Sequence, residues 1–171
     1  VSGGVGGAGR LVAVADGSIY RWTTSGQVIG RPLEIPVDPV EAEQRPVLAT
    51  SARLSPDGRT LVAASSDGHI YLWTLGEGEQ AAGPAQVLQG VHPGGALSVQ
   101  FSQDGKRILS FGVDDTLRVW DAPFSFLARE LRGHTQGVRS ATFSPDGREV
   151  LSAGADGAVK LWRLQAPDLL P

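Results

Sequence analysis

One phrase recurs four times along the chain and limits what it can fold into. It reads "LVAVADGSIYRW" from Leu11 to Trp22 and "LSAGADGAVKLW" from Leu151 to Trp162, with "VAASSDGHIYLW" and "LSFGVDDTLRVW" between them. Each copy places an Asp six residues before a Trp and puts alternating apolar residues between them. All four tryptophans of the chain hold this position, and successive ones are 42 to 51 residues apart. A self-similar period of this length is typical of solenoids and propellers.

A second motif, a tight turn, marks the same register. "SPDG" begins at Ser55 and Ser144, and "SQDG" begins at Ser102. The segments that flank the last turn, 138–144 and 149–154, alternate or are rich in β-forming residues, and 158–162 follows as a third short strand. A more variable strand is expected over 127–133. Four antiparallel strands per repeat predict an all-β fold built of propeller blades.

These repeats resemble the WD40 family of β-propellers. The third repeat carries the Trp-Asp dipeptide itself, Trp120-Asp121, and the fourth carries the family's Gly-His pair, Gly133-His134. The resemblance runs from about residue 10 to the end of the fourth repeat. We therefore expect a glycine-rich flexible start over 1–9 and a WD40 propeller segment over 10–171, with repeats at about 10–36, 45–90, 91–132 and 133–165.

The resemblance implies a buried hydrogen-bond chain of Trp, Ser or Thr, His and Asp in each blade. A buried imidazole or carboxylate is tolerated only when it is hydrogen-bonded. Repeats three and four carry all four residue types. Repeat two has Arg45 and Ala63 at the His and hydroxyl positions, so Asp67 is expected to lack both partners unless Arg45 replaces them. Repeat one has Val12 at the hydroxyl position. The implied network residues are Asp16, Trp22, Asp67, Trp73, His92, Ser110, Asp114, Trp120, His134, Ser152, Asp156 and Trp162.

Other chemistry finds little support. A Ser, His and Asp set that recurs between strands is expected to be buried, whereas a nucleophile and its base must meet substrate. The cluster "GVGGAG" (Gly4 to Gly9) matches a dinucleotide fingerprint, but it follows no strand and begins no helix. The three histidines fall in three different repeats, and the chain has no Cys. We therefore expect no catalytic residue, no cofactor and no metal site, and we do not expect an enzyme.

The function expected from the resemblance is a non-catalytic scaffold that binds a protein or peptide. The net charge of −3 comes without a run of like charge, which disfavours nucleic acid and anionic membranes as partners. The alternatives are a sensor or autoinhibitory module of an NTPase, kinase or protease effector, and then a propeller enzyme. The residues that the resemblance implies for partner binding are Thr50, Leu97, Arg139, Ser66, Val113 and Ala155.

The setting is inferred from composition and from strand counting. Arg far outnumbers Lys, and Asn and Cys are absent, which favours a bacterial, cytoplasmic signalling or regulatory protein. Repeat one shows no alternating segment before Leu11, and repeat four ends after its third strand. This predicts about fourteen strands, in groups of three, four, four and three. An open arc would expose apolar blade faces. We therefore expect the C-terminal part of a ring of about seven blades, completed by the same polypeptide or, as alternatives, by a second copy or as a closed ring of four blades.

Overall fold

A computed structural model describes residues 2–6, 10–36, 46–76, 81–88, 92–122, 124 and 127–164. Within these ranges the chain forms fourteen strands joined by turns and loops, and no helix. The all-β class predicted from the sequence is therefore confirmed. In chain order the strands are β1 (Ser2–Gly6), β2 (Arg10–Ala15), β3 (Ser18–Thr23), β4 (Ala49–Leu54), β5 (Thr60–Ser65), β6 (Ile70–Leu75), β7 (Ala81–Val87), β8 (Ala96–Phe101), β9 (Arg107–Gly112), β10 (Thr116–Asp121), β11 (Leu127–Arg132), β12 (Val138–Phe143), β13 (Glu149–Gly154) and β14 (Val159–Arg163).

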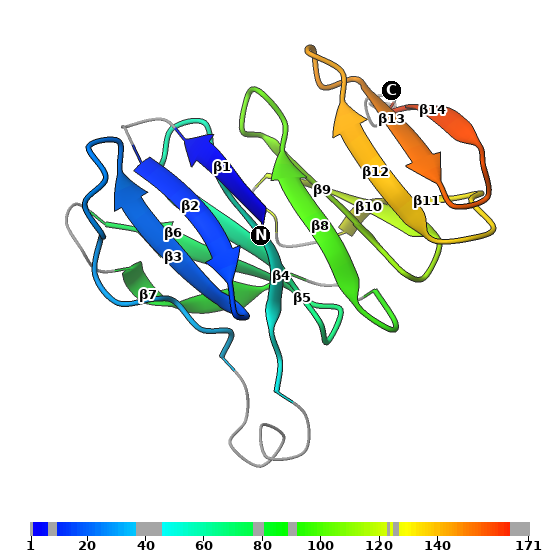
Figure 1. Cartoon of the computed structure of the whole chain (residues 1–171). Coiled ribbons are helices and arrows are strands. Elements are labelled where there is room, and N and C mark those ends of the chain that lie inside the picture. Colours follow the sequence, from blue (N-terminus) through cyan, green and yellow to red (C-terminus); the bar gives the residue numbers. More distant parts are fainter. Residues whose placement is uncertain are drawn as a thin grey trace.

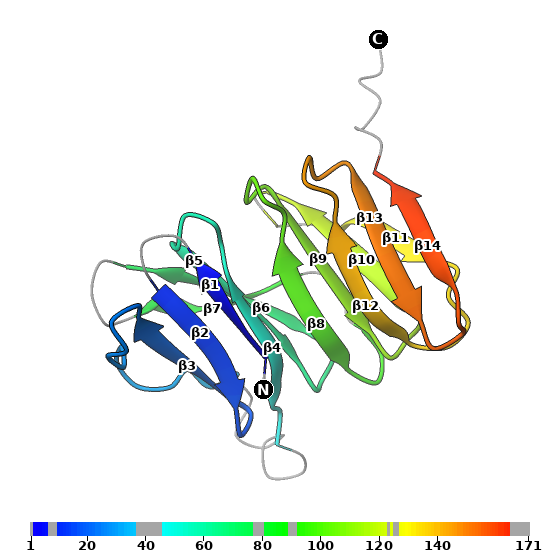
Figure 2. The same cartoon turned by 45° about the horizontal axis from the view of Figure 1, so that its top comes forward.

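The strands pair into four antiparallel sheets, which we call blades one to four. Blade one contains β1 to β3, blade two β4 to β7, blade three β8 to β11 and blade four β12 to β14. The sheets stand side by side in an open arc, with blade one and blade four at its opposite ends (Figures 1 and 2). The first strand of each blade lies at the same edge of its sheet. We call β1, β4, β8 and β12 the inner strands.

The Ser-x-Asp-Gly turns connect the first two strands of blades two, three and four. In blade two the Ser55 hydroxyl donates to Asp57, and Asp57 accepts the backbone N–H of Arg59 at 3.0 Å. Ser55 also accepts the backbone N–H of Thr60 at 2.9 Å, and Gly58 has a φ of 70° that favours glycine. The other two turns repeat this pattern. Local turn chemistry therefore sets the spacing between each inner strand and its neighbour.

Blade one differs from the sequence-based expectation. Residues 2–6 were expected to belong to a flexible start, but they form β1, which pairs with β2 from Ser2 opposite Val14 to Gly6 opposite Arg10. Strand pairing uses backbone groups, so a glycine-rich segment can pair without showing an alternating side-chain pattern. Residues 7–9 lie outside the described part of the chain. The count of three strands thus holds for blade one, but the inner strand is present.

The outer edge of blade one is irregular. Where blades two and three have β7 and β11, the described residues of blade one form only isolated bridges, Ile19 with Leu33 and Trp22 with Val28. The backbone N–H of Ile29 also donates to the carbonyl of Arg21 at 2.8 Å. This segment takes the place of a fourth strand without forming a regular ladder.

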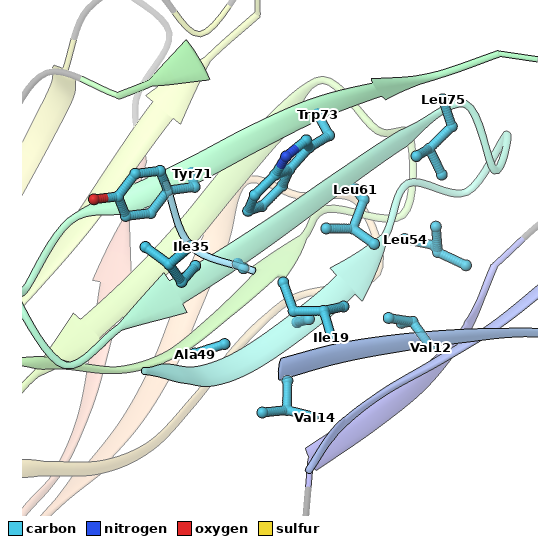
Figure 3. Close-up of a cluster of buried hydrophobic side chains, with 12 residues drawn as sticks. Val12, Val14, Ile19, Ile35, Ala49, Leu54, Leu61, Tyr71, Trp73 and Leu75 are labelled. Carbon is cyan, nitrogen blue, oxygen red and sulfur yellow. The ribbon is translucent and has the colours of Figure 1, made fainter. Parts of the chain in front are cut away.

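The cores lie between neighbouring blades. In the first interface, Val12, Val14 and Ile19 of blade one face Leu61 and Trp73 of blade two (Figure 3). All five of these residues lie on strands. Two similar clusters join blade two to blade three and blade three to blade four. Burial of apolar area in these interfaces is the main term that stabilises the arc.

One apolar face of blade four has no neighbour within the described chain. It carries Leu151, Val159 and Leu161, which are 47%, 68% and 58% exposed. The strand pairing makes these residues equivalent to three residues of blade three that are packed against blade four. Those residues are Leu109, Leu117 and Val119, which are 0%, 0% and 2% exposed. We call Leu151, Val159 and Leu161 the free face of blade four.

Candidate functional site

Blade four contains a complete buried polar chain. The indole N–H of Trp162 donates to Ser152 Oγ at 2.8 Å, and the Ser152 hydroxyl donates to His134 Nε2 at 2.8 Å. The Nδ1–H of His134 then donates to Asp156 at 3.0 Å. The carboxylate can only accept, so it fixes the proton on Nδ1 and leaves Nε2 to accept. The structure thus brings all four residues together.

Asp156 is anchored by backbone groups as well. The backbone N–H groups of Ala158, at 3.0 Å, and Thr135, at 3.1 Å, lower the pKa of Asp156 to about 2, and burial opposes them. The carboxylate therefore joins two turns at one end of the blade. Because Ser152 is buried and its hydroxyl is engaged on both sides, this arrangement holds the blade together and offers no nucleophile to a substrate.

Blade three repeats the His, Ser and Asp part of this chain. His92 Nδ1 lies 2.8 Å from Asp114 Oδ1 and 2.6 Å from the guanidinium of Arg118, and His92 Nε2 lies 2.6 Å from Ser110 Oγ. Burial lowers the pKa of His92, and the hydrogen bond to Asp114 opposes that shift. The imidazole is therefore held neutral in a buried site.

Blade three also contains an ion-pair network that sequence reasoning missed. The buried guanidinium of Arg118 donates to Asp114 Oδ2 at 2.8 Å and to Glu130 at 2.8 Å. Arg118 lies two residues before Trp120, and a charged residue inside the apolar run "TLRVW" was a usable signal. Its partner Glu130 lies on the next strand, β11, so spacing alone did not connect the two.

The carboxylate of Asp67 in blade two accepts hydrogen bonds from two hydroxyl groups and a backbone N–H. Ser65 donates to its carboxylate, the Tyr71 hydroxyl donates at 2.9 Å and the backbone N–H of His69 donates at 2.9 Å. Tyr71 occupies the position of Arg118 in the neighbouring blade. The expectation that Asp67 lacks a hydroxyl partner is therefore wrong, because its own hairpin supplies two. Arg45 lies outside the described residues.

Blade one has a shorter hairpin than the other blades. Asp16 has a φ of 51° and Gly17 a φ of 77°, which makes a two-residue turn of the type that favours Asp-Gly. The register places Ala13 opposite Tyr20, so Ala13, and not Val12, holds the hydroxyl position. Within the part of the chain that the structure describes, the Asp16 side chain makes no hydrogen bond.

The remaining tryptophans contribute mainly apolar area. Trp120 is wholly buried in the interface between blades two and three, and Trp73 is buried between blades one and two. Trp22 is partly exposed and stacks on Tyr20, with ring centroids 5.9 Å apart. The same sequence position therefore serves packing in every blade, and its indole N–H is bonded to Ser152 in blade four.

Two of the six residues implied for partner binding lie together. Leu97 on β8 is 41% exposed, and Arg139 on β12 is exposed. Both line a hollow of about 450 Å³ at the inner strands. Thr50 holds the equivalent position on β4, but its hydroxyl donates to the Ala96 carbonyl at 2.7 Å. Leu97 and Arg139 are therefore the available pair.

The other three residues lie in the hairpin turns. Ser66, Val113 and Ala155 are exposed. Ser66 Oγ accepts the backbone N–H of Leu48 at 3.0 Å, which ties it to the start of β4. None of the three lines the hollow. The six residues thus divide into a group at the inner strands and a group in the turns.

The hollow is lined by residues of the inner strands β4, β8 and β12 and by one residue of β9. Its lining residues are Arg53, Leu97, Ser98, Val99, Gln100, Phe111, Arg139, Ser140 and Ala141. A hydrogen bond of 2.8 Å from the Gln100 amide to the Ala141 carbonyl holds β8 to β12 across it. Among the described residues, no group of three His, Asp or Glu side chains is placed to hold a metal ion. No helix in the described segments has the length and hydrophobicity of a membrane span.

Comparison with known proteins supports the repeat assignment. The family model for the WD domain, G-beta repeat (WD40) matches residues 41–74, 85–121 and 125–163, which together make up more than half of the chain. The matches cover blades two to four, whereas blade one, with its shortened hairpin and irregular edge, is identified by its repeat phrase and by its structure.

Individual relatives are similar over part of the chain. A "Chromatin assembly factor 1 subunit FAS2 homolog" of Oryza sativa subsp. japonica is 34% identical over 83 residues, which is 48% of this chain and 16% of that protein. "WD repeat-containing protein 1" of Xenopus tropicalis is 38% identical over 69 residues, 40% of this chain and 11% of that protein. "Serine-threonine kinase receptor-associated protein" of Homo sapiens is 32% identical over 97 residues, 57% of this chain and 26% of that protein. The chain thus matches about a quarter or less of the length of these relatives.

Proposed function

The chain belongs to the WD40 repeat family, and on this basis we propose that it is a non-catalytic scaffold that binds a protein or peptide at its inner strands. WD40 repeat proteins are generally scaffolds that bind other proteins. The observation that carries the proposal is the exposed pair Leu97 and Arg139 in the hollow. An apolar and an Arg side chain on strands held by their blades suit a binding hot spot.

The buried Ser-His-Asp sets favour a scaffold over an enzyme. In blades three and four the Ser and His side chains are buried and hydrogen-bonded to each other. A hydrolytic site needs a hydroxyl that substrate can approach. Fold alone does not decide function, so the proposal rests on these side chains.

Site-specific photo-crosslinking tests the face. A photoreactive amino acid at Leu97, which is 41% exposed on β8, should form adducts with a partner in cells that express the chain. The matched control is Val87, which is 43% exposed on the outer strand β7. Adducts at position 97 and none at position 87 would support the proposal. Adducts at position 87 alone would place the partner on the other edge of the blades.

We place this function in the bacterial cytoplasm, within a larger signalling or regulatory protein. The support is compositional: Arg in place of Lys, and no Asn or Cys. The relatives described above are eukaryotic proteins. A role as the sensing or restraining module of an NTPase, kinase or protease is the second candidate in that setting.

We also propose that the free face of blade four packs against a further WD40 blade of the same polypeptide. The three interfaces inside the chain indicate what this face binds. In each interface, the side of one blade that is equivalent to Leu151, Val159 and Leu161 packs against the opposite side of the next blade. Blade one carries Tyr20 and Trp22 on that opposite side, and both side chains are only partly buried. Ring closure through further blades would cover both surfaces.

A further inference from the structure

The charges on the inner strands are all of one sign. Among the described residues, β1, β4, β8 and β12 carry Arg53 and Arg139 and no Asp or Glu. The whole chain has a net charge of −3, so this edge differs in sign from the molecule as a whole. A concave surface that gathers one sign of charge focuses its field on ligands of the opposite sign.

The two arginines share the hollow described above. Arg53 comes from blade two and Arg139 from blade four, on either side of β8, and the residues that line the hollow include no carboxylate. Arg53 is half-buried, burial lowers its pKa, and its guanidinium donates to the Ala52 carbonyl at 2.8 Å. Arg139 is exposed. A carboxylate in the hollow would lie near both guanidinium groups and could form charge-assisted hydrogen bonds with them.

The rest of the lining suits a peptide. Ser98 and Ser140 also line the hollow, and Leu97 adds an exposed apolar side chain from β8, the strand between those that carry the two arginines. A ligand that contacts both arginines crosses β8, the strand that carries Leu97. An isolated small anion uses one arginine and leaves the apolar part uncovered. A volume of about 450 Å³ falls in the range of ligand sites.

We propose that this hollow binds an acidic peptide segment, with carboxylates on Arg53 and Arg139 and an apolar side chain on Leu97. The inference rests on the proposed scaffold function and names the chemistry of its ligand. Nucleic acid is disfavoured, because two cations on an acidic chain give little of the charge neutralisation that such ligands need.

Fluorescence anisotropy on the 171-residue chain tests the ligand class. A labelled hexaglutamate peptide should bind and should weaken as salt is raised, whereas hexaglutamine and hexalysine should not bind. Arg139→Gln should weaken hexaglutamate about tenfold, as expected for one charge-assisted contact. Arg163→Gln, a change at an arginine 80% exposed on β14, is the matched control and should leave the affinity unchanged. The Arg53→Lys variant keeps the positive charge but not the planar guanidinium that can bind a carboxylate through two N–H groups. Its affinity for hexaglutamate should lie between those of the wild type and Arg139→Gln.

Each result has a defined meaning. Equal affinity of the wild type and Arg139→Gln for hexaglutamate, or no binding by a folded wild type, would overturn the proposal. Competition by inorganic phosphate at the same concentration as the peptide would assign the site to small anions and would also overturn it. If crosslinking at Leu97 succeeds but the crosslinked segment is not acidic, the acidic ligand is wrong and the scaffold function stands. If crosslinking fails and hexaglutamate still binds through Arg139, the scaffold function is wrong and the anionic site stands.

Discussion

Replacing equivalent leucines in blades three and four should have very different effects on stability. Leu109 is wholly buried where blade three packs against Val138 and Val150 of blade four. Leu151 has the same place in blade four but is 47% exposed, because no blade covers it within the described chain. The Leu109→Ala and Leu151→Ala variants therefore make the same chemical change in two environments.

The magnitudes follow from burial. Leu109→Ala removes three buried carbons and leaves a cavity, which costs about 3 kcal/mol of unfolding free energy within a usual range of about 2–5 kcal/mol. For a chain of this size that lowers Tm by about 6–12 °C. Leu151→Ala removes carbons worth about 0.8 kcal/mol each when buried, and with about half of that burial and no cavity it costs about 1 kcal/mol. The expected loss in Tm is then about 2–4 °C.

Thermal and urea unfolding followed by tryptophan fluorescence would measure both losses. The comparison is made at a protein concentration at which light scattering shows a monomer, so that self-association does not cover Leu151. Equal losses for the two variants under that condition would contradict this expectation, since they would show that Leu151 is buried in the monomer. A larger loss for Leu151→Ala at high concentration alone would agree with a face that binds another blade.

Three further predictions concern the polar networks. Ser152→Ala should cost about 1–3 kcal/mol by chemical unfolding, because it leaves the Trp162 N–H and the His134 imidazole without their shared partner; a loss below a few tenths would contradict the chain of bonds. His92 has a folded pKa below its unfolded value, so its contribution is present above about pH 6.5 and is lost as the pH falls below that value. The His92→Asn variant should accordingly show a flatter stability profile between pH 7 and pH 5 than the wild type, and parallel profiles would refute the assignment. Asp67→Asn should lower Tm measurably, since the carboxylate accepts two hydroxyl groups and a backbone N–H, and an unchanged Tm would mean that these bonds contribute nothing.

The blades could be predicted from the sequence because local chemistry fixes them. The Ser-x-Asp-Gly turns and the Asp six residues before each Trp are short-range features, and each one sets a hairpin by itself. The Trp-Ser-His-Asp positions in blades three and four follow from the same spacing, and the structure brings His134, Ser152, Asp156 and Trp162 together. Regular repeats make such counting reliable.

Positions counted from the repeat spacing were wrong where that spacing changed. Elements that depend on backbone pairing alone gave no pattern to count. The residue missing from the first hairpin lies between Ala13 and Asp16, so counting back from Trp22 reached Val12 in place of Ala13. β1 has few side chains with which to show a pattern, and the Arg118–Glu130 pair forms across two strands. Arg118 and Glu130 lie directly opposite each other on β10 and β11, and the variable sequence of β11 gave no motif from which that alignment could be counted.

The chain is a row of WD40 blades, and we propose that the free face of blade four packs on another blade. Size-exclusion chromatography with light scattering over a wide dilution series, with a dye that reports exposed apolar surface, tests this most directly. We expect concentration-dependent self-association and dye binding by the 171-residue chain, both reduced by Leu161→Glu on the free face and unaffected by Leu97→Glu. A chain that stays monomeric at every concentration and binds no dye would contradict this proposal and would indicate a closed ring of four blades.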